Sequence, residues 1–344
     1  MTIINGFEID ITEYIPNTIK ASIRQNEPLD EKLHVIAVIS NPCLYARRYI
    51  LMKEFIERFE QEEPDAILYI IELLYGRQQN IITDSKNPRH LQIQTVVPLW
   101  HKESMINVGI NKLLPKDWKA VAWVDADLEF ENCTWAKDTL RILNGNYDIV
   151  QLFSHCVDMD YNKNTMTIFN SAGYQYTKQN KYCGKGPDFW HPGYAWACTR
   201  KTYDKMGGLF DKAILGSGDN IMCFSLLQNG LKAINIQSTE GYKQTVINFQ
   251  DRVKNLRFGY VPGIIRHHFH GSKKNRKYME RWEILVKYNY NPKVDISYDK
   301  NGLVVPTHSC PFGLLADIYR YFEERNEDEG VVEYKLPLPT PHNV

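Results

Sequence analysis

Two carboxylates separated by one residue follow an apolar run near the middle of the chain. Asp125 and Asp127 come directly after residues 120–124, AVAWV. Two acids at a strand end can both reach a divalent cation, either directly or through water or a sugar hydroxyl, and Mg²⁺ and Mn²⁺ favour such oxygen ligands and are often shared with phosphates. The same Asp-Ala-Asp sequence also occurs in solvated surface turns. Acids directly after a buried strand are costly unless solvated or liganded, and this placement weighs against a plain surface turn.

Three histidines lie within four positions further along the chain, at His267, His268 and His270. Neutral imidazole is a good ligand for Mn²⁺-like ions. An extended backbone would put His268 on the same face as His270, whereas a turn near residue 269 would bring His267 and His270 together. A basic run follows, which is either a solvated face or a means of neutralising a diphosphate; its members are Lys273, Lys274, Arg276, Lys277 and Arg281.

Residues 190–220 combine aromatic rings, glycines and one acid at a predicted helix start. Trp190 and Trp196 offer flat faces on which sugar rings can stack. Asp219 lies between Gly218 and Asn220. An N-cap is the ordinary role for an aspartate there, and the functional alternative is a general base that takes a proton from an acceptor hydroxyl.

The elements that must position these residues alternate between strands and helices. Apolar runs predict strands at 33–40, 66–76, 92–99 and 118–130, and amphipathic stretches predict helices at 46–61 and 102–115. This order predicts an α/β fold with a mostly parallel, doubly wound sheet, whose ligands usually lie at the carboxyl ends of the strands. Residues 146–153 predict another strand, and residues 154–190 predict long loops. Helices are expected at 199–208 and 220–230, each closing at glycine.

Composition limits the classes of partner. The chain has 344 residues with 41 Lys+Arg and 41 Asp+Glu, so no overall field attracts a polyanion. Seven cysteines without C-x-x-C spacing fit neither a disulfide framework nor a thiolate zinc site. The N-terminal residues lack a signal-peptide pattern, and no apolar run is long enough to span a bilayer, so a cytoplasmic protein without a membrane span is expected. The acidic, proline-containing end is expected to be partly mobile.

Several motifs, taken in order, resemble the GT-A-fold, metal-dependent glycosyltransferases that use nucleotide sugars. GGLFDKAILGSGDN is similar to a segment of the β-1,4-galactosyltransferases and the polypeptide N-acetylgalactosaminyltransferases, and IIRHHFHGSKKN resembles the galactosyltransferase stretch that carries a metal-binding histidine. SNPCLYARRY, WHKESMIN, AWVDADLEF, WHPGYAWA and HGSKKNRKYMERW occur in the same order in glycosyltransferase-like proteins of bacteriophages and large DNA viruses. The resemblance covers roughly residues 33–300. One departure is Gly218, where the related families carry a second acid beside Asp219.

The resemblance implies a role for each matching residue. The metal, Mn²⁺ or Mg²⁺, would be bound by Asp127, His267 and His270, with Asp125 binding the metal or the donor ribose. Donor contacts would come from Ser40, Asn41, Arg48, Glu72, Asp125, Lys273 and Arg276. The acceptor would meet Trp190, His191, Gly193, Trp196, Gly218 and Asn220, and Asp219 would act as the base.

The resemblance also implies an organisation and an activity. An N-terminal extension at 1–30 precedes a catalytic domain at 31–275, with a nucleotide-sugar half at 31–150 and an acceptor half at 151–275, and a C-terminal helical or irregular extension spans 276–344. The expected reaction moves a sugar from a nucleoside-diphosphate sugar, UDP-linked, to a hydroxyl of a glycan, a protein or a hydroxymethylated DNA base, with inversion; for a viral protein the site of action would be the host cytoplasm. The alternatives are a metal-dependent nucleotidyltransferase or phosphohydrolase, and a non-catalytic glycan- or DNA-binding module.

Overall fold

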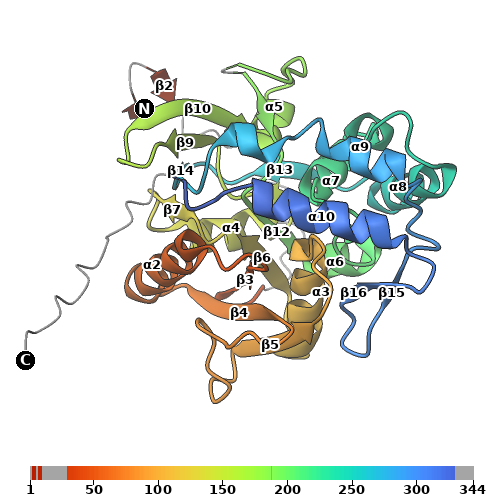
Figure 1. Ribbon diagram of the computed structural model, residues 1–344. Coiled ribbons are helices and arrows are strands. Elements are labelled where there is room, and N and C mark those ends of the chain that lie inside the picture. Colours follow the sequence, from red (N-terminus) through yellow and green to blue (C-terminus); the bar gives the residue numbers. More distant parts are fainter. Residues whose placement is uncertain (1, 5–6, 10–28, 187, 330–344) are drawn as a thin grey trace, which may run out of the picture.

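The computed structural model describes residues 2–4, 7–9, 29–186 and 188–329 (Figure 1). Most of the predicted N-terminal extension and the last residues, 330–344, lie outside the described residues, whereas the acidic run at 323–329 is described. Two short strands, β1 (Thr2–Ile4) and β2 (Phe7–Ile9), pair antiparallel.

A seven-stranded sheet forms the centre of the molecule, in the order β13-β8-β12-β6-β3-β4-β5. Its strands are β3 (Leu33–Ser40), β4 (Ala66–Tyr75), β5 (His90–Thr95), β6 (Ala120–Val124), β8 (Ile149–Gln151), β12 (Ala195–Thr199) and β13 (Phe258–Tyr260). All neighbours are parallel except those of β12, which runs antiparallel to both β6 and β8. This mostly parallel α/β sheet flanked by helices confirms the predicted fold class.

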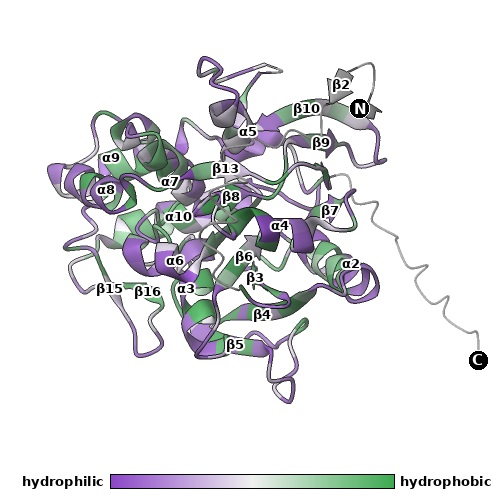
Figure 2. Cartoon of the chain, turned by 180° about the vertical axis from the view of Figure 1, so that it is seen from behind, coloured by the Kyte–Doolittle hydropathy of each residue, from purple (hydrophilic) through white to green (hydrophobic). Residues whose placement is uncertain are grey.

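Helices cover both faces of this sheet because its strands are apolar on both sides. Ile36 of β3 belongs to a core shared with α3 (Lys102–Leu113), whereas its neighbour Val35 packs into a second core with α2 (Ala46–Glu62) and α4 (Trp135–Leu143). Figure 2 shows hydrophobic strands enclosed by helices whose outer faces are hydrophilic. Alternate residues of one strand therefore stabilise two different layers.

The core on the α3 side also receives the later helices, α6 (Arg200–Met206), α7 (Gly218–Leu226), α8 (Glu240–Val253), α9 (Arg281–Lys287) and α10 (Phe312–Glu324). Leu314 and Ile318 of α10 are fully buried in it. Part of the predicted C-terminal extension thus shares its core with the sheet. Short elements complete this region: η1 (Gly230–Ala233), η2 (Lys273–Arg276), and the hairpin strands β15 (Ile296–Tyr298) and β16 (Val304–Pro306).

A second, five-stranded sheet lies beyond the carboxyl end of β6, in the order β11-β10-β9-β14-β7. Its strands are β7 (Leu128–Phe130), β9 (His155–Met159), β10 (Thr165–Ser171), β11 (Trp190–His191) and β14 (Ile264–His267), and α5 (Ala172–Thr177) follows β10. Residues 154–190 were predicted to be long loops, so that prediction is wrong for β9, β10 and α5. Three connections cross from the large sheet to this one, from β6 to β7, β8 to β9 and β13 to β14.

None of the helices within the described ranges combines the length and apolar content needed to cross a bilayer.

Candidate active site

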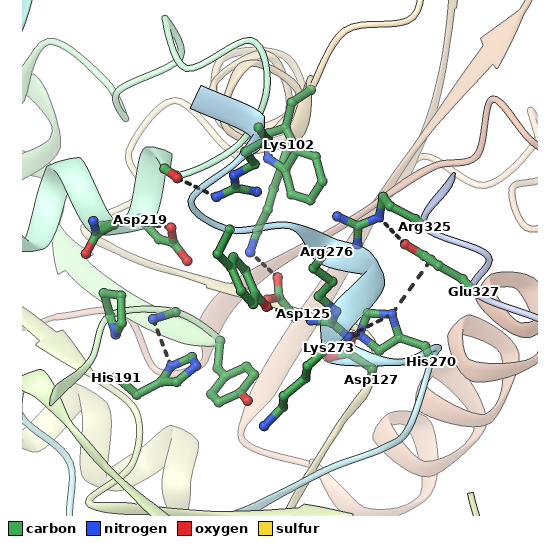
Figure 3. A pocket seen from close by; sticks show the side chains of 18 of the residues that line it. Lys102, Asp125, Asp127, His191, Asp219, His270, Lys273, Arg276, Arg325 and Glu327 are labelled. Carbon is green, nitrogen blue, oxygen red and sulfur yellow. Dashed lines mark hydrogen bonds and ion pairs between the residues drawn. The ribbon is translucent and has the colours of Figure 1, made fainter. Parts of the chain in front are cut away.

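A cavity of about 740 Å³ lies where the two sheets meet, and Trp282 of α9 and Phe322 of α10 also line it. Strand β6 ends at Val124, and the chain carries both predicted acids across the junction before β7 begins at Leu128. Figure 3 shows carboxylates, imidazoles and cationic side chains converging on this space. Of the residues predicted from sequence, the cavity is lined by Ser40, Arg48, Asp125, Asp127, His191, Gly193, Asp219, Asn220, His267, His270, Lys273 and Arg276.

Asp127, His267 and His270 form a cluster whose ligand atoms all lie within 4.8 Å of one another. Strand β14 pairs antiparallel with β7, and the backbone N–H that follows His267 donates to the carbonyl of Asp127 over 2.8 Å. Oδ2 of Asp127 is 2.9 Å from Nε2 of His270 and 3.7 Å from Nε2 of His267. Burial opposes ionisation of Asp127, but the two histidines hold the pKa of its carboxyl well below the usual range.

The donor set of this cluster fits a divalent transition ion. One carboxylate and two imidazoles suit Mn²⁺ or Zn²⁺, and both rings present nitrogen to the same carboxylate. Oδ1 of Asp127 is buried without a hydrogen-bond partner. A buried oxygen without a partner costs free energy unless a ligand, such as a metal ion, contacts it. The residues present therefore fit a metal ion.

The third histidine points elsewhere. His268 is 1% exposed, and its Nε2 lies 3.3 Å from a carboxylate oxygen of Glu129. The chain turns after His267, so the arrangement is the one that pairs His267 with His270 and leaves His268 on the other side of the backbone.

Asp125 is held by Lys102, the first residue of α3. The two side chains form an ion pair, with 21% of Lys102 and 25% of Asp125 exposed to the cavity. Burial disfavours the charged ammonium, yet Asp125, Asp219 and Glu103 keep the pKa of Lys102 above its usual range. Burial raises the pKa of the Asp125 carboxyl despite the attraction of Lys102. Asp125 thus faces a cation, and Asp127 faces the histidines.

Asp219 lies in the first turn of α7, opposite the metal-ligand cluster in the view of Figure 3. The residue before this helix is Ser217, with a left-handed φ of 77°, and its side chain makes no capping bond. Oδ1 of Asp219 accepts from the backbone N–H of Asn220 over 2.7 Å, and Oδ2 lies so near Gly193 that a Cβ there would approach it to 2.8 Å. Asp219 is therefore not the N-cap residue, although one of its oxygens satisfies an N–H of the first turn, and its side chain borders the cavity.

His191 faces Asp219 across Gly193. Its ring stacks on Tyr194 at 4.1 Å, and its Nδ1 accepts from the Gly193 backbone N–H over 3.1 Å. Burial, helped by repulsion from His267, lowers the pKa of His191 to about 3. Tyr194 has a φ of 81°, which non-glycine residues rarely adopt. A neutral imidazole and a strained turn thus flank the acid, an arrangement common at functional sites.

The cationic side of the cavity draws on the C-terminal residues. A guanidinium nitrogen of Arg276 lies 2.8 Å from Nε2 of His270. Arg325 bonds Glu327 over 2.6 Å, and Glu327 pairs with Arg48 as well. The attraction of these arginines outweighs burial and holds the pKa of Glu327 well below its usual range. Sequence reasoning missed Arg325 and Glu327 because they lie in a segment with no motif, far along the chain from the histidines.

Two predicted donor residues do not reach the cavity. Asn41 is 2% exposed, and its side chain bonds both backbone groups of Tyr45, so it shapes the turn before α2. Glu72 is buried, and its two oxygens accept from the backbone N–H groups of Ile81, Ile82 and Thr83 and from the Thr83 hydroxyl. These contacts correct both predictions: the polar atoms are used in holding loops.

Three predicted acceptor residues also belong to the interior. Trp196 is 1% exposed and stacks on Phe258 at 5.3 Å, and Trp190 is 7% exposed in the same core, so neither offers a free face to a sugar. Gly218 packs against the carboxyl of Glu103 and lies behind the cavity wall. Aromatic rings that do line the cavity include those of Trp100, Phe169, Tyr182, Phe189, His191, Tyr194 and Trp282.

Comparisons with known proteins give a structural likeness only. No model of a protein family matches the chain, and no curated protein matches it by sequence. Among solved structures, the catalytic domain of Drosophila β1,4-galactosyltransferase 7 in complex with xylobiose has 11% identity and a TM-score of 0.37 over 84% of this chain and 99% of its own.

A mutant of the same Drosophila enzyme in complex with manganese, UDP-Gal and xylobiose has 8% identity and a TM-score of 0.40 over 83% of this chain and 98% of its own. A protein described as a nucleotide-diphospho-sugar transferase from Desulfovibrio desulfuricans G20 has 10% identity and a TM-score of 0.33 over 86% and 99%. Identities and TM-scores this low carry no argument about the activity of this chain.

Proposed function

We propose that the chain is a metal-dependent glycosyltransferase of the GT-A type that transfers a sugar from a UDP-sugar to an acceptor hydroxyl with inversion. The observation that carries the proposal is the division of one cavity into two sides. Asp127, His267 and His270 form a metal-ligand set beside Lys273 and Arg276, and Asp219 borders the same cavity from α7.

The residues of each side would have distinct tasks. Asp127, His267 and His270 would hold a divalent ion, with Mn²⁺ suiting their donor set better than Mg²⁺, and this ion would supply charge stabilisation at the diphosphate. Lys273 and Arg276 would bind the phosphate oxygens, and Ser40 and Arg48, at the end of β3 and the start of α2, would meet the nucleoside. Asp125, already paired with Lys102, would accept a hydrogen bond from a ribose hydroxyl.

Asp219 would take the proton of the acceptor hydroxyl as its oxygen attacks the anomeric carbon and the bond to the diphosphate breaks. The neutral ring of His191 and the half-buried ring of Phe169 would bound the acceptor side, where the hydroxyl of a glycan or of a hydroxymethylated DNA base would enter. Stabilisation of the departing diphosphate by fixed cations is worth more in the transition state than in the ground state, and it therefore raises the rate.

The test is a panel of nucleoside-diphosphate sugars incubated with Mn²⁺, with release of nucleotide and free sugar as the readout. One donor should be hydrolysed slowly, and EDTA or Asp127→Asn should abolish this hydrolysis. Asp160→Asn is the matched control, since that aspartate is partly exposed, lies outside the cavity lining and has a side chain that bonds nearby asparagine groups. Release of inorganic phosphate would instead identify a phosphohydrolase. Formation of a bond between nucleotides would identify a nucleotidyltransferase, and binding without turnover would identify a glycan- or DNA-binding module.

Asp219→Asn gives a second test of the assignment. It should lower turnover far more than it weakens donor binding, because a base acts on the acceptor and not on the nucleotide. An unchanged rate would remove Asp219 from the reaction while leaving the metal assignment intact.

A further inference from the structure

Asp158 is a buried carboxylate that no part of the proposed reaction uses. It lies on β9, where its side chain is 1% exposed among the apolar residues Cys156, Val157 and Met159. A carboxylate in such surroundings is strongly destabilising unless it is paired and hydrogen-bonded. Its partners therefore indicate what it does.

The first partner is the metal-ligand histidine of the neighbouring strand. Strands β9 and β14 run parallel, and their register places Asp158 directly opposite His267. Oδ1 of Asp158 lies 2.6 Å from Nδ1 of His267. A carboxylate can only accept, so Nδ1 of the imidazole carries the proton in this contact.

The second partner is a predicted diphosphate-binding cation. Oδ2 of Asp158 lies 2.5 Å from Nζ of Lys273, whose ammonium also lies 4.4 Å from the centre of the Phe169 ring. Although burial favours the neutral acid, His267 and Lys273 hold the pKa of Asp158 below its usual range. Both oxygens of one carboxylate are thus used, one on each side chain.

The contact with Nδ1 has a consequence for the opposite edge of the ring. When Nδ1 carries the proton, Nε2 of a neutral imidazole has a free lone pair, and Nε2 is the atom that faces Asp127 at 3.7 Å. A carboxylate behind a metal-binding histidine fixes the ring orientation and raises the basicity of the ligand atom.

We propose that Asp158 is a positioning residue, which holds His267 in the tautomer that offers Nε2 to the metal and fixes the ammonium of Lys273 beside the same ion. This inference rests on the metal site of the proposed function. It adds a link between two parts of that site, because loss of one carboxylate would loosen a metal ligand and a phosphate-binding cation together.

The experiment measures Mn²⁺ binding by the full chain without any sugar donor, using electron paramagnetic resonance of free Mn²⁺. Asp158→Asn should weaken Mn²⁺ binding by roughly 10- to 100-fold, the usual effect of removing such a carboxylate. Glu129→Gln is the matched control, because Glu129 contacts the neighbouring His268, which points away from the cluster; its Mn²⁺ affinity should equal that of the wild type. Equal Mn²⁺ affinity in Asp158→Asn and wild type would overturn the inference.

A second measurement needs no variant. ¹⁵N NMR of the His267 ring in the metal-free wild type, at alkaline pH where the imidazole is neutral, should report the proton on Nδ1. A proton on Nε2 would contradict the inference even if Asp158→Asn failed to fold. Failure of wild-type protein to bind Mn²⁺ would reject the proposed metal site instead, so the two failures are distinguishable.

Discussion

The carboxyl group of Glu103 occupies the space that a side chain at Gly218 would need. A Cβ built at Gly218 would lie 2.5 Å from Cδ of Glu103 and 2.6 Å from its Oε1. Glu103 belongs to the first turn of α3 and is buried, whereas Gly218 begins α7. The carboxyl of Glu103 therefore packs against the start of α7, next to the residue that precedes Asp219.

We predict that Gly218→Ala destabilises the protein through this contact. Forcing a methyl group against a packed carboxyl should cost about 1–3 kcal/mol, measured by urea unfolding. In a Glu103→Ala background the same change should cost much less, and the double-mutant cycle gives the coupling. Gly184→Ala, whose Cβ would meet only Tyr182 at an ordinary 3.4 Å, is the control. Equal costs in both backgrounds would show that the clash lies elsewhere.

Glu103 also predicts a pH dependence of stability. Burial, reinforced by Asp219 and opposed by Lys102, raises the pKa of Glu103 to about 8. The folded state then binds the proton more tightly than the unfolded state, so this contribution to stability is complete below the unfolded pKa and is lost as pH rises through about 8.

Glu103→Gln keeps the shape of the side chain and cannot ionise. Above pH ~8 the variant should therefore be more stable than the wild type by up to ~5 kcal/mol, and the difference should shrink as pH falls and vanish below ~4.3, the pKa of a glutamate in the unfolded chain. Unfolding free energies of both proteins across the pH range provide the measurement. Because Glu63, with a pKa raised to about 7 by burial, titrates in both proteins, it cancels in the difference. A difference that does not change with pH would refute the assignment.

Sequence alone predicted the features of the fold and of the candidate site that depend on local pattern. Strand β3 was predicted with its observed bounds, residues 33–40, because an apolar run between turn residues has few other readings. Both arrangements of the histidines were consistent with the sequence. The pairing of β14 with β7 and β9 ends at His267, and the turn that follows selects the arrangement in which His267 and His270 lie together.

The rest depends on contacts between distant segments. Trp196 and Phe169 are both aromatic residues of strands, and nothing in the sequence around them indicates that one faces the core and the other the cavity. Asp158 and Glu327 are acids in segments without a motif, and their roles arise from strand register and from the return of the chain after α10. Burial of such polar residues is decided by tertiary pairing, which local pattern does not encode.

The ion pair between Lys102 and Asp125 should contribute measurably to stability. Lys102→Met would leave Asp125 beside Asp127 and Asp219 without its cation, and because the pair keeps some exposure to the cavity, the cost should be about 1–3 kcal/mol. Adding Asp125→Asn should recover part of the loss, since no unpaired charge remains. Urea unfolding measures both changes.

The control is an exposed pair of the same chemical type. Lys243 contacts Glu240 over 2.8 Å, and 88% of that glutamate side chain is exposed. Lys243→Met should change stability by less than about 1 kcal/mol. If Lys102→Met were equally mild, Lys102 would not be the counter-charge that keeps Asp125 ionised.

The contrast between Trp196 and Phe169 tests which aromatic rings meet the acceptor. Trp196 fills the core between the sheet and the helices on the α3 side, so Trp196→Ala should destabilise the protein by ~3–5 kcal/mol, measured by thermal or urea unfolding.

Phe169 is only half-buried and borders His191, so Phe169→Ala should cost much less stability. In the proposed reaction it should reduce transfer to the acceptor more than acceptor-free hydrolysis of the donor, because its ring borders His191 on the acceptor side and also meets the ammonium of Lys273. Trp196→Phe, which retains an aromatic ring in the core, should keep near-normal transfer. Loss of transfer in a folded Trp196→Phe, together with normal transfer in Phe169→Ala, would restore Trp196 as the stacking residue.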